Sequence, residues 1–435
     1  MNKVIIRSAA TIAIIFIMAW SNHISAQSDS LAHYLTVAAE NNPGLKADFL
    51  SYKAAMERVP QMGTLPDLQL DMGFYIQPMD VIDGRQVADF TLMQMFPWFG
   101  TRKAAQSETE HQANAAFEQF RESRDKLFLE VYTQWYVLAS LNQKLKNIDE
   151  HHQYLKQIES IAIKKYSSST GESSKTSNMS STLRVSLESV ELDNSRETVL
   201  SEIKSETARF NALLNRASNA KVVMPDSISQ THFTLDVSNA MSQLPNSNPS
   251  LAMITEESKS FRAKALADKK MSMPMIGLGV QYSVINKRLP TVIPISDMNG
   301  MDMIMPMVSV SIPIYRKKYK AQQRESKIMQ QASNEMYNQT YNNLKADLIS
   351  INHELEYASR TINLLDKQAE IANTTYNLVL QEYATGKSEL TDVIQVQRQL
   401  LDYKLRRADA IALYNTKVAE AQRLISFNDN INYNK

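Results

Sequence analysis

The placement of proline is the feature that most constrains how this chain can fold. None of its 13 prolines lies in residues 98–224 or in residues 314–435, so two long runs lack the strongest helix breaker. Within these runs glycine occurs only at Gly100, Gly171 and Gly386, and glycine commonly ends a helix. Each run therefore predicts two long helices joined once, at Gly171 or at Gly386. The expected helices cover residues of about 101–166, 173–216, 316–383 and 388–427.

Apolar residues inside these runs recur at alternating spacings of three and four. Spacing of this kind forms a seam that packs against neighbouring helices as in a coiled coil. His151 and His152 stand beside the first series, and we expect them on solvated helix surface rather than in a metal site. The two series are Leu138, Leu141, Leu145, Ile148 and Leu155, and then Val393, Val396, Leu400 and Tyr403.

The chain contains the same order of features twice. Each half runs from a short helix through an Asn-Pro junction, a second helix and two strands to a pair of long helices. The corresponding landmarks are Asn42-Pro43 and Asn248-Pro249, Phe96-Pro97 and Ile312-Pro313, and Tyr166 and Tyr383. We therefore expect a first repeat over residues 27–219, a linker over 220–234, a second repeat over 235–427 and a flexible tail over 428–435.

The first 26 residues have the pattern of a secretory signal peptide. Lys3 and Arg7 supply its charged region, residues 9–20 are almost entirely apolar, and Ile24-Ser25-Ala26 offers a cleavage site. We therefore expect the protein to be exported. Because the sequence contains no cysteine, we expect neither a disulfide nor the acylated cysteine of a lipoprotein.

Composition argues against two other functional classes. The formal net charge is only +1, whereas a nucleic-acid-binding protein usually has a basic face that shows in this balance. The sequence has no phosphate loop, nucleophile–base pair or carboxylate dyad of recognisable spacing. We therefore expect a protein that binds no nucleic acid, is not an enzyme and uses no cofactor.

Each half also contains two segments in which apolar residues alternate strictly with small or polar ones. Ile276, Leu278 and Val280 alternate with Gly277 and Gly279, for example. Such strands suit a barrel wall with lipid outside and water inside, although a soluble sandwich gives the same alternation. Four strands cannot close a transmembrane barrel, which needs about eight, so several chains would have to contribute. The expected strands cover residues of about 66–78, 86–97, 274–286 and 302–313.

Taken together, these residues resemble the TolC-like outer membrane factors, the exit ducts of tripartite efflux pumps and type I secretion systems. The resemblance rests on the duplicated Asn-Pro junctions, the strand-proline-helix steps at Pro97 and Pro313, and the turn Tyr383-Ala-Thr-Gly-Lys…Leu-Thr-Asp-Val. It implies an α+β fold in which trimerisation completes a membrane β-barrel, continuous with a long coiled-coil α-helical barrel. It also implies a periplasmic adaptor protein, an inner membrane transporter and outer membrane lipid as partners.

The resemblance further implies a gate at the periplasmic end of the helical barrel. Tyr383 matches the tyrosine of the family's closing network, and Asp392 matches one position of its acidic ring. Gln395 stands where the family has a second acid, which leaves one acid per chain. For Asp392, a solvated carboxylate that the helix dipole favours is an equally good interpretation. The expected hairpin tips and adaptor contacts are Tyr166, Gly171, Thr385, Gly386 and Lys387.

Methionine is frequent, with 22 residues. Thioethers bind Cu(I) and Ag(I), so a duct for such ions is one interpretation, which would agree with the heavy-metal efflux branch of the family. Methionine is also a flexible hydrophobe, so simple packing is the other interpretation. The candidates on the water-facing side of the expected strands are Met93, Met95, Met303, Met305 and Met307.

We therefore expect a passive, trimeric exit duct in the outer membrane, belonging to an efflux pump and spanning into the periplasm. A type I protein secretion duct is the alternative within the family. A soluble periplasmic coiled-coil adaptor or scaffold is the alternative outside it. The sequence leaves the cargo open between metal ions, drugs and proteins.

Overall fold

The computed structural model of the chain describes residues 31–168, 172–225, 227–288 and 297–425. The expected signal peptide and the expected tail after residue 427 lie outside these residues. The chain forms two compact units. The first comprises the described residues up to Pro43, together with Lys126–Thr234 and Ile351–Ala421, and the second comprises Gly44–Asp125, Leu235–Ser350 and the described residues from Gln422.

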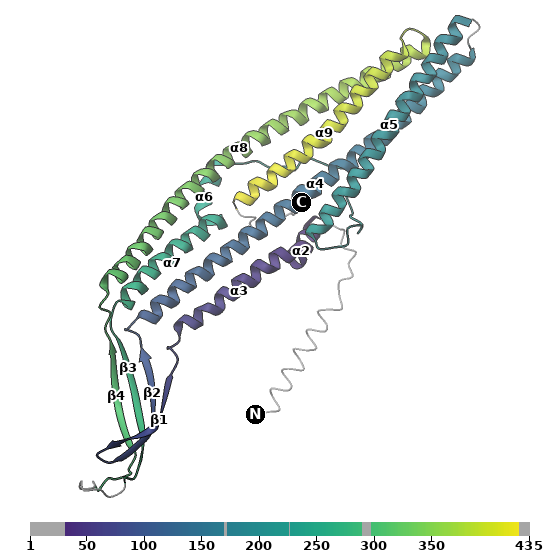
Figure 1. The fold of residues 1–435 in the computed structure, drawn as a ribbon. Coiled ribbons are helices and arrows are strands. Elements are labelled where there is room, and N and C mark those ends of the chain that lie inside the picture. The colour runs from purple at the N-terminus through teal and green to yellow at the C-terminus, as the bar shows by residue number, and fades with distance from the viewer. Residues whose placement is uncertain (1–30, 169–171, 226, 289–296, 426–435) are drawn as a thin grey trace, which may run out of the picture. The chain divides into compact units, whose positions relative to one another are not determined.

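Eight helices are assigned within the described residues, and the two longest contribute to both units (Figure 1). As the absence of proline predicts, each run contains two long helices. No helix in the described part of the chain has an apolar stretch long enough to cross a membrane. The helices are α2 Leu31–Asn41, α3 Pro43–Gly63, α4 Thr101–Ser168, α5 Glu172–Leu213, α6 Val237–Ser247, α7 Pro249–Met271, α8 Arg316–Thr385 and α9 Leu390–Leu424.

Four strands form one antiparallel sheet in the second unit, in the order β1-β2-β3-β4 (Figure 1). The two hairpins, one from each repeat, pair along β2 and β3, so the sheet is shared between the repeats. This confirms the predicted fold class of long helices with four strands per chain. The strands are β1 Gln69–Val81, β2 Gly84–Phe96, β3 Met275–Asn286 and β4 Met303–Ser311.

β1 begins and ends about three residues later than the alternation predicts. Pro66 lies before it and has no N–H to donate to a ladder. Pro78 lies inside it, in an interval where the pairing with β2 shifts register between Phe74 and Met79. A proline is tolerated there because β1 is an edge strand of the sheet. β4 is the other edge and also contains a proline, Pro306.

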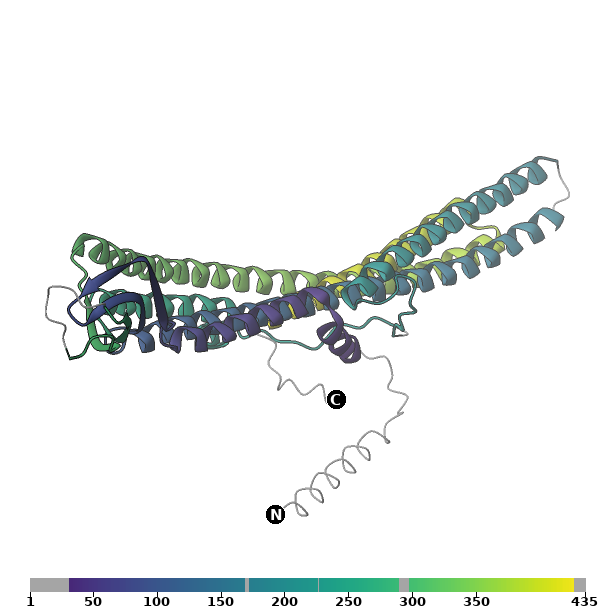
Figure 2. The same ribbon diagram turned by 60° about the horizontal axis from the view of Figure 1, so that its bottom comes forward.

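In the second unit, α3, α7 and the N-terminal parts of α4 and α8 lie side by side in both views (Figures 1 and 2). Aromatic rings join α3 to α4, with the ring centroids of Phe49 and Phe120 5.3 Å apart. Polar contacts join α7 to its other neighbours. The Ser326 hydroxyl of α8 donates to the Asp268 carboxylate at 2.6 Å, in a buried environment.

In the first unit, apolar side chains of α4, α5, α8 and α9 form one buried cluster. Its members follow the predicted coiled-coil seams, as at Leu141, Ile148 and Leu155 of α4. The expectation for the two histidines is wrong for His151, whose exposure is 0%. In a straight helix the side that faces the core shifts gradually relative to a seven-residue repeat. A residue beside the apolar seam can therefore face the core further along the helix. His152 instead contacts Asp193, with 2.7 Å between Nε2 and Oδ1.

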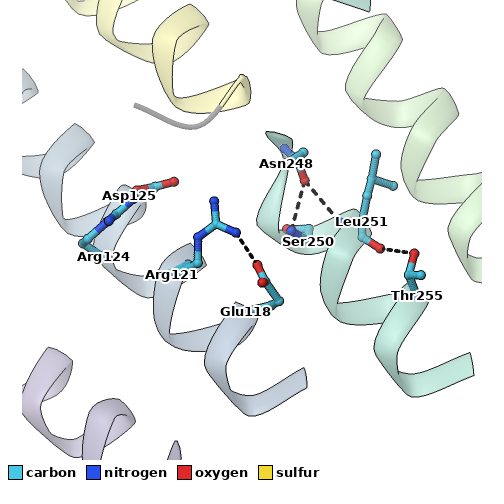
Figure 3. Close-up of polar contacts among 8 residues, drawn as sticks. All are labelled: Glu118, Arg121, Arg124, Asp125, Asn248, Ser250, Leu251 and Thr255. Atoms are coloured by element: carbon cyan, nitrogen blue, oxygen red, sulfur yellow. Dashed lines mark hydrogen bonds and ion pairs between the residues drawn. The ribbon is translucent and has the colours of Figure 1, made fainter. Parts of the chain in front are cut away.

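The two Asn-Pro junctions make the same bond in each repeat. Figure 3 shows Asn248 at the start of α7, where its side-chain oxygen accepts from the backbone N–H of Ser250 at 3.0 Å and of Leu251 at 3.3 Å. Its amide nitrogen donates to the Leu424 carbonyl at the end of α9, at 2.9 Å. Asn42 donates in the same way to the Leu213 carbonyl at the end of α5, at 3.0 Å. Each junction is therefore tied to the last helix of its own repeat.

Candidate functional site

The sheet has one apolar face and one polar face. Residues paired across the strands share a face, so each register row identifies one side of the sheet. One row contains Met72, Phe90, Tyr282 and Ile304, and the adjacent row on the opposite face contains Asp71, Thr91, Gln281 and Met305. The apolar face is open to the surroundings of the chain, with Phe74 71% exposed, Leu278 51% and Val308 72%.

All five candidate methionines lie on the polar face of the sheet. Met93 pairs with Gly279, which pairs on its other side with Met307. Met95 pairs with Gly277. A side chain built at Gly277 would have its Cβ 2.7 Å from the Met95 sulfur and 3.4 Å from the Met93 sulfur. The glycine thus leaves the space in which two thioethers come together. Met303 and Met305 follow on β4, opposite Ser283 and Gln281.

The turn after α8 is shaped by Gly386. Its φ is +81°, in the left-handed region that favours glycine. The Gly386 N–H donates to the Tyr383 carbonyl at 3.1 Å, and the Lys387 N–H donates to the Glu382 carbonyl at 2.9 Å. These two bonds form a Schellman motif, which satisfies the last carbonyls of the helix. A Cβ at Gly386 would contact nothing within 4 Å, so backbone conformation alone requires the glycine.

Tyr383, on the last turn of α8, is buried rather than open to a channel. It is 5% exposed within the apolar cluster of the first unit. The Lys165 ammonium of α4 lies 4.0 Å from the centre of its ring and also donates to its backbone carbonyl oxygen. Burial raises the pKa of Tyr383, and burial lowers the pKa of Lys165. Lys165 therefore contacts Tyr383 through the face of its ring and through its backbone carbonyl.

Asp392 and Gln395, both on α9, are exposed. The Asp392 carboxylate accepts from the Ser388 hydroxyl at 3.0 Å and from the Glu389 backbone N–H at 3.3 Å. A third-position acid that reaches back to the residue before the helix is half of a capping box, and the helix dipole favours its charge. These bonds give Asp392 a structural role that is independent of any gate.

The structure describes some, but not all, of the residues expected at the hairpin tips. Thr385, Gly386 and Lys387 are exposed at the α8–α9 turn. Tyr166 lies in the last turn of α4, and Gly171 lies outside the described residues. The structure therefore brings Tyr383, Thr385, Gly386 and Lys387 into one turn.

Two polar contacts near this turn were missed by the sequence reasoning. One is Lys165 on Tyr383, for which the pair Lys164-Lys165 beside Tyr166 is the available sequence signal. The other joins α9 to α5, where the Arg398 guanidinium binds Glu188, with 2.8 Å between Nε and Oε2, and Glu191 at 3.2 Å. The acids stand three residues apart and therefore on one helix face, which could have indicated an arginine partner.

A buried polar pair lies within the same helices. His151 Nδ1 and Gln397 Nε2 are 2.9 Å apart, joining α4 to α9. Burial, and secondarily the Lys404 charge, lowers the pKa of His151 to about 3, so the imidazole is neutral at physiological pH. No group of three or more His, Cys, Asp or Glu side chains with metal-site geometry occurs in the described ranges.

Comparison with known proteins identifies the fold and gives a family match for part of the chain. Residues 240–425 match the family model of the outer membrane efflux proteins. The match covers 186 of the 435 residues, nearly all of them in the second repeat. Among curated proteins, none matches the sequence. The fold is that of the outer membrane efflux channels, as several solved structures demonstrate over both repeats.

The solved structures are similar over nearly their whole length. VceC, an outer membrane protein from Vibrio cholerae, is 13% identical, with 91% of this chain and 96% of that chain covered and a TM-score of 0.72. CusC is 14% identical, with coverages of 91% and 92% and a TM-score of 0.73. The outer membrane channel MtrE of Neisseria gonorrhoeae is 13% identical, with coverages of 91% and 88% and a TM-score of 0.71. The predicted resemblance to the outer membrane factors is confirmed.

Proposed function

We propose that this protein is an outer membrane exit duct of an efflux pump. The observation that carries the proposal is the open apolar face of the sheet, on which Phe74, Leu278 and Val308 are each at least half exposed. In water such a face would be covered by another layer of the protein. A sheet with an apolar outer face and a polar inner face fits a barrel wall that is surrounded by lipid.

The strand count supports an oligomer of two or more chains, and a trimer is the one that the resemblance implies. Within the described residues the sheet is open at β1 and at β4. Unpaired strand edges are not tolerated in lipid, and a closed barrel needs at least about eight strands. Three chains would supply twelve strands by pairing the β4 edge of one with the β1 edge of the next. The long helices that leave the same sheet would then form the helical barrel below it.

In this duct the α8–α9 turn lies at the periplasmic mouth, with Tyr383, Asp392 and Gln395 at the gate. The exposed Thr385, Gly386 and Lys387, together with Tyr166 and Gly171, would receive a periplasmic adaptor protein and an inner membrane transporter. The duct would be passive, because the channel itself supplies no energy. A type I protein secretion duct uses the same architecture, and a soluble periplasmic scaffold is the rival without a membrane.

Membrane fractionation combined with cross-linking tests the duct. Cysteines introduced as Asp71→Cys on β1 and Ser309→Cys on β4 stand on the two edge strands. Within one chain they are separated by three strand spacings, about 14 Å, and by four residues along the strand, about 13 Å. Since the chain has no native cysteine, a bismaleimide shorter than this separation would join them only between chains. We expect detergent-dependent extraction and a cross-linked trimer. Recovery as a soluble monomer without detergent would contradict the duct and favour the scaffold.

A second candidate concerns the cargo, and we propose soft monovalent cations, Cu(I) or Ag(I). The supporting observation is that the Met93 and Met95 sulfurs both lie within 3.4 Å of the position that a Cβ of Gly277 would occupy, on the polar face of the sheet. An apolar filler has little to pack against on a water-facing wall, whereas thioethers are preferred ligands of these ions. Met305 and Met307 stand on the same face of β4.

Silver titration of the full-length protein, labelled with ¹³C at the methionine methyl groups, tests this cargo. We expect Ag(I) at micromolar concentration to shift the methyl resonances of Met93 and Met95 first. The variant with Met93, Met95, Met305 and Met307 replaced by Leu should lose binding. Replacing Met253, Met329 and Met336, which lie on helices of the same unit, should leave it intact. Equal shifts at all methionines would instead indicate simple packing.

A further inference from the structure

Two long helices begin with clusters of positive charge. α4 begins with Thr101-Arg102-Lys103, and α8 begins with Arg316-Lys317-Lys318. Neither helix has an acid in its first turn. The helix dipole places partial positive charge at a helix N-terminus, so these five side chains oppose it. We call Arg102, Lys103, Arg316, Lys317 and Lys318 the basic belt. Their placement is not explained by helix stability.

Two other helix ends of this chain have charges that the dipole favours. α7 has Lys269 and Lys270 in its last turn, where cations are favourable. α9 has Asp392 in its first turn, where an anion is favourable. The reversal at the belt is therefore local. It suggests that these cations interact with an anion outside the helix.

The belt residues have no carboxylate partner within the described part of the chain. All five are exposed. Arg102 donates from Nη1 to the Gly63 carbonyl at 3.2 Å, and the Lys318 ammonium lies 5.8 Å from the ring centre of Tyr319. Both contacts leave the positive charge without a counter-charge. An unpaired cluster of this kind is available to an anionic surface.

The belt lies at the end of the sheet from which both helices leave. Phe96 and Val310, near the ends of β2 and β4, both pair with Ile276 of β3, so the two exits share one row of the sheet. Figure 1 shows the starts of α4 and α8 next to this end. Large apolar side chains accompany the charges and are strongly exposed. They are Phe99 at 81%, Ile314 at 71% and Tyr315 at 77%.

An apolar groove lies beside the belt. Its volume is about 340 Å³, and its lining includes Leu65, Trp98, Phe99, Leu278 and the single cation Arg102. The groove continues from the apolar face of the sheet, to which Leu278 belongs. An apolar slot with one guanidinium beside it matches an acyl chain that carries a phosphate.

We propose that the basic belt binds the phosphate groups of anionic phospholipids in the membrane leaflet at this end of the sheet. The acyl chain of one such lipid lies in the groove beside Trp98. The proposal rests on the proposed function, because it needs the sheet to stand in a membrane. Aromatic and basic side chains at one level would also fix the depth of the sheet in the bilayer.

Fluorescence quenching by brominated lipids tests the belt on the full-length protein in vesicles. Trp98 is the reporter, and the Trp98→Phe variant supplies the background to be subtracted. Quenching by brominated phosphatidylglycerol and by brominated phosphatidylcholine gives the relative affinity for anionic lipid. We expect a preference for the anionic lipid of at least about fivefold, which one cation near an anionic surface can supply. It should weaken at 1 M salt, where the screening length is about 3 Å.

The decisive variant replaces all five belt residues by Gln and should reduce the preference to about one. Its folding is not at risk from the dipole, because the replaced charges oppose it. The matched control removes the same charge from exposed helix positions of the first unit. It replaces Lys156, Lys164, Lys204, Arg360 and Lys367 by Gln, and should keep the native preference.

The outcomes separate the belt from the duct. Equal quenching by the two lipids, or a preference that survives in the five-site belt variant, would overturn the belt while leaving the membrane location in place. Absence of quenching by either lipid would show that Trp98 does not meet lipid. That result would overturn the lipid in the groove, whereas membrane fractionation decides the membrane location and the proposed function.

Discussion

Replacing Val308 by Arg is expected to abolish assembly of this protein in the outer membrane. Val308 lies on the apolar face of β4 and is 72% exposed. If this face meets lipid, a guanidinium there costs about 2–4 kcal/mol near the bilayer midplane. In the proposed trimer, three equivalent sites would multiply the penalty. The measurement is the amount of heat-resistant trimer in purified outer membranes, which should fall by at least about tenfold.

The next residue along the chain provides the control. Ser309 points to the opposite, polar face, and Ser309→Arg places the same side chain one residue away. We expect that variant to assemble normally, because the guanidinium would reach water inside the barrel. If the two variants assembled equally well, the apolar face would not be the lipid face. If only Ser309→Arg failed, the faces would be reversed, as in a soluble sandwich.

Loosening the contacts around the α8–α9 turn is expected to raise single-channel conductance. Lys165 holds Tyr383 from α4, and Arg398 holds α9 to Glu188 of α5. Loss of one cation–π contact and one exposed ion pair amounts to about 2 kcal/mol. In a two-state gate that change shifts the ratio of open to closed channels by about thirtyfold. The variant is Lys165→Met combined with Arg398→Met, measured in planar bilayers.

Two controls distinguish this gate from a general loss of stability. Tyr383→Phe keeps the ring face and the carbonyl that Lys165 contacts, so we expect native conductance. Arg407→Met removes a contact with Asp366, which joins α9 to α8 rather than to α5, and should also leave conductance unchanged. Native conductance in the Lys165 and Arg398 variant would show that these contacts do not close the channel.

The long helices and the strands could be predicted because local rules determine them. Proline and glycine mark where helices must stop, and the two-residue period marks strands with one apolar face. The alternation also placed Met93 and Met303 on one face. The pairing of β2 with β3 was beyond such reasoning, because it joins residues about 190 positions apart that share no local signal.

The candidate site was predictable in outline only. Gly386 predicted the turn, since few other residues adopt its backbone conformation. The ring of Tyr383 and the ammonium of Lys165 are 218 residues apart in sequence, and only packing of α4 against α8 brings them together. The burial of His151 depended on how α4 rotates relative to three other helices. A coiled-coil pattern resolves such rotations poorly when the helix is straight.

The asparagines of the two Asn-Pro junctions impose an order on the folding steps of the chain. Asn248 bonds to Leu424, 176 residues later, and Asn42 bonds to Leu213, 171 residues later. Contacts of such long sequence separation form after local helices, because the loop they close is entropically costly. During synthesis the buried Asn248 amide has no Leu424 carbonyl to meet until the last helix has emerged. The start of α7 is therefore completed only after α9 has been synthesised, so the second repeat cannot mature ahead of its own end.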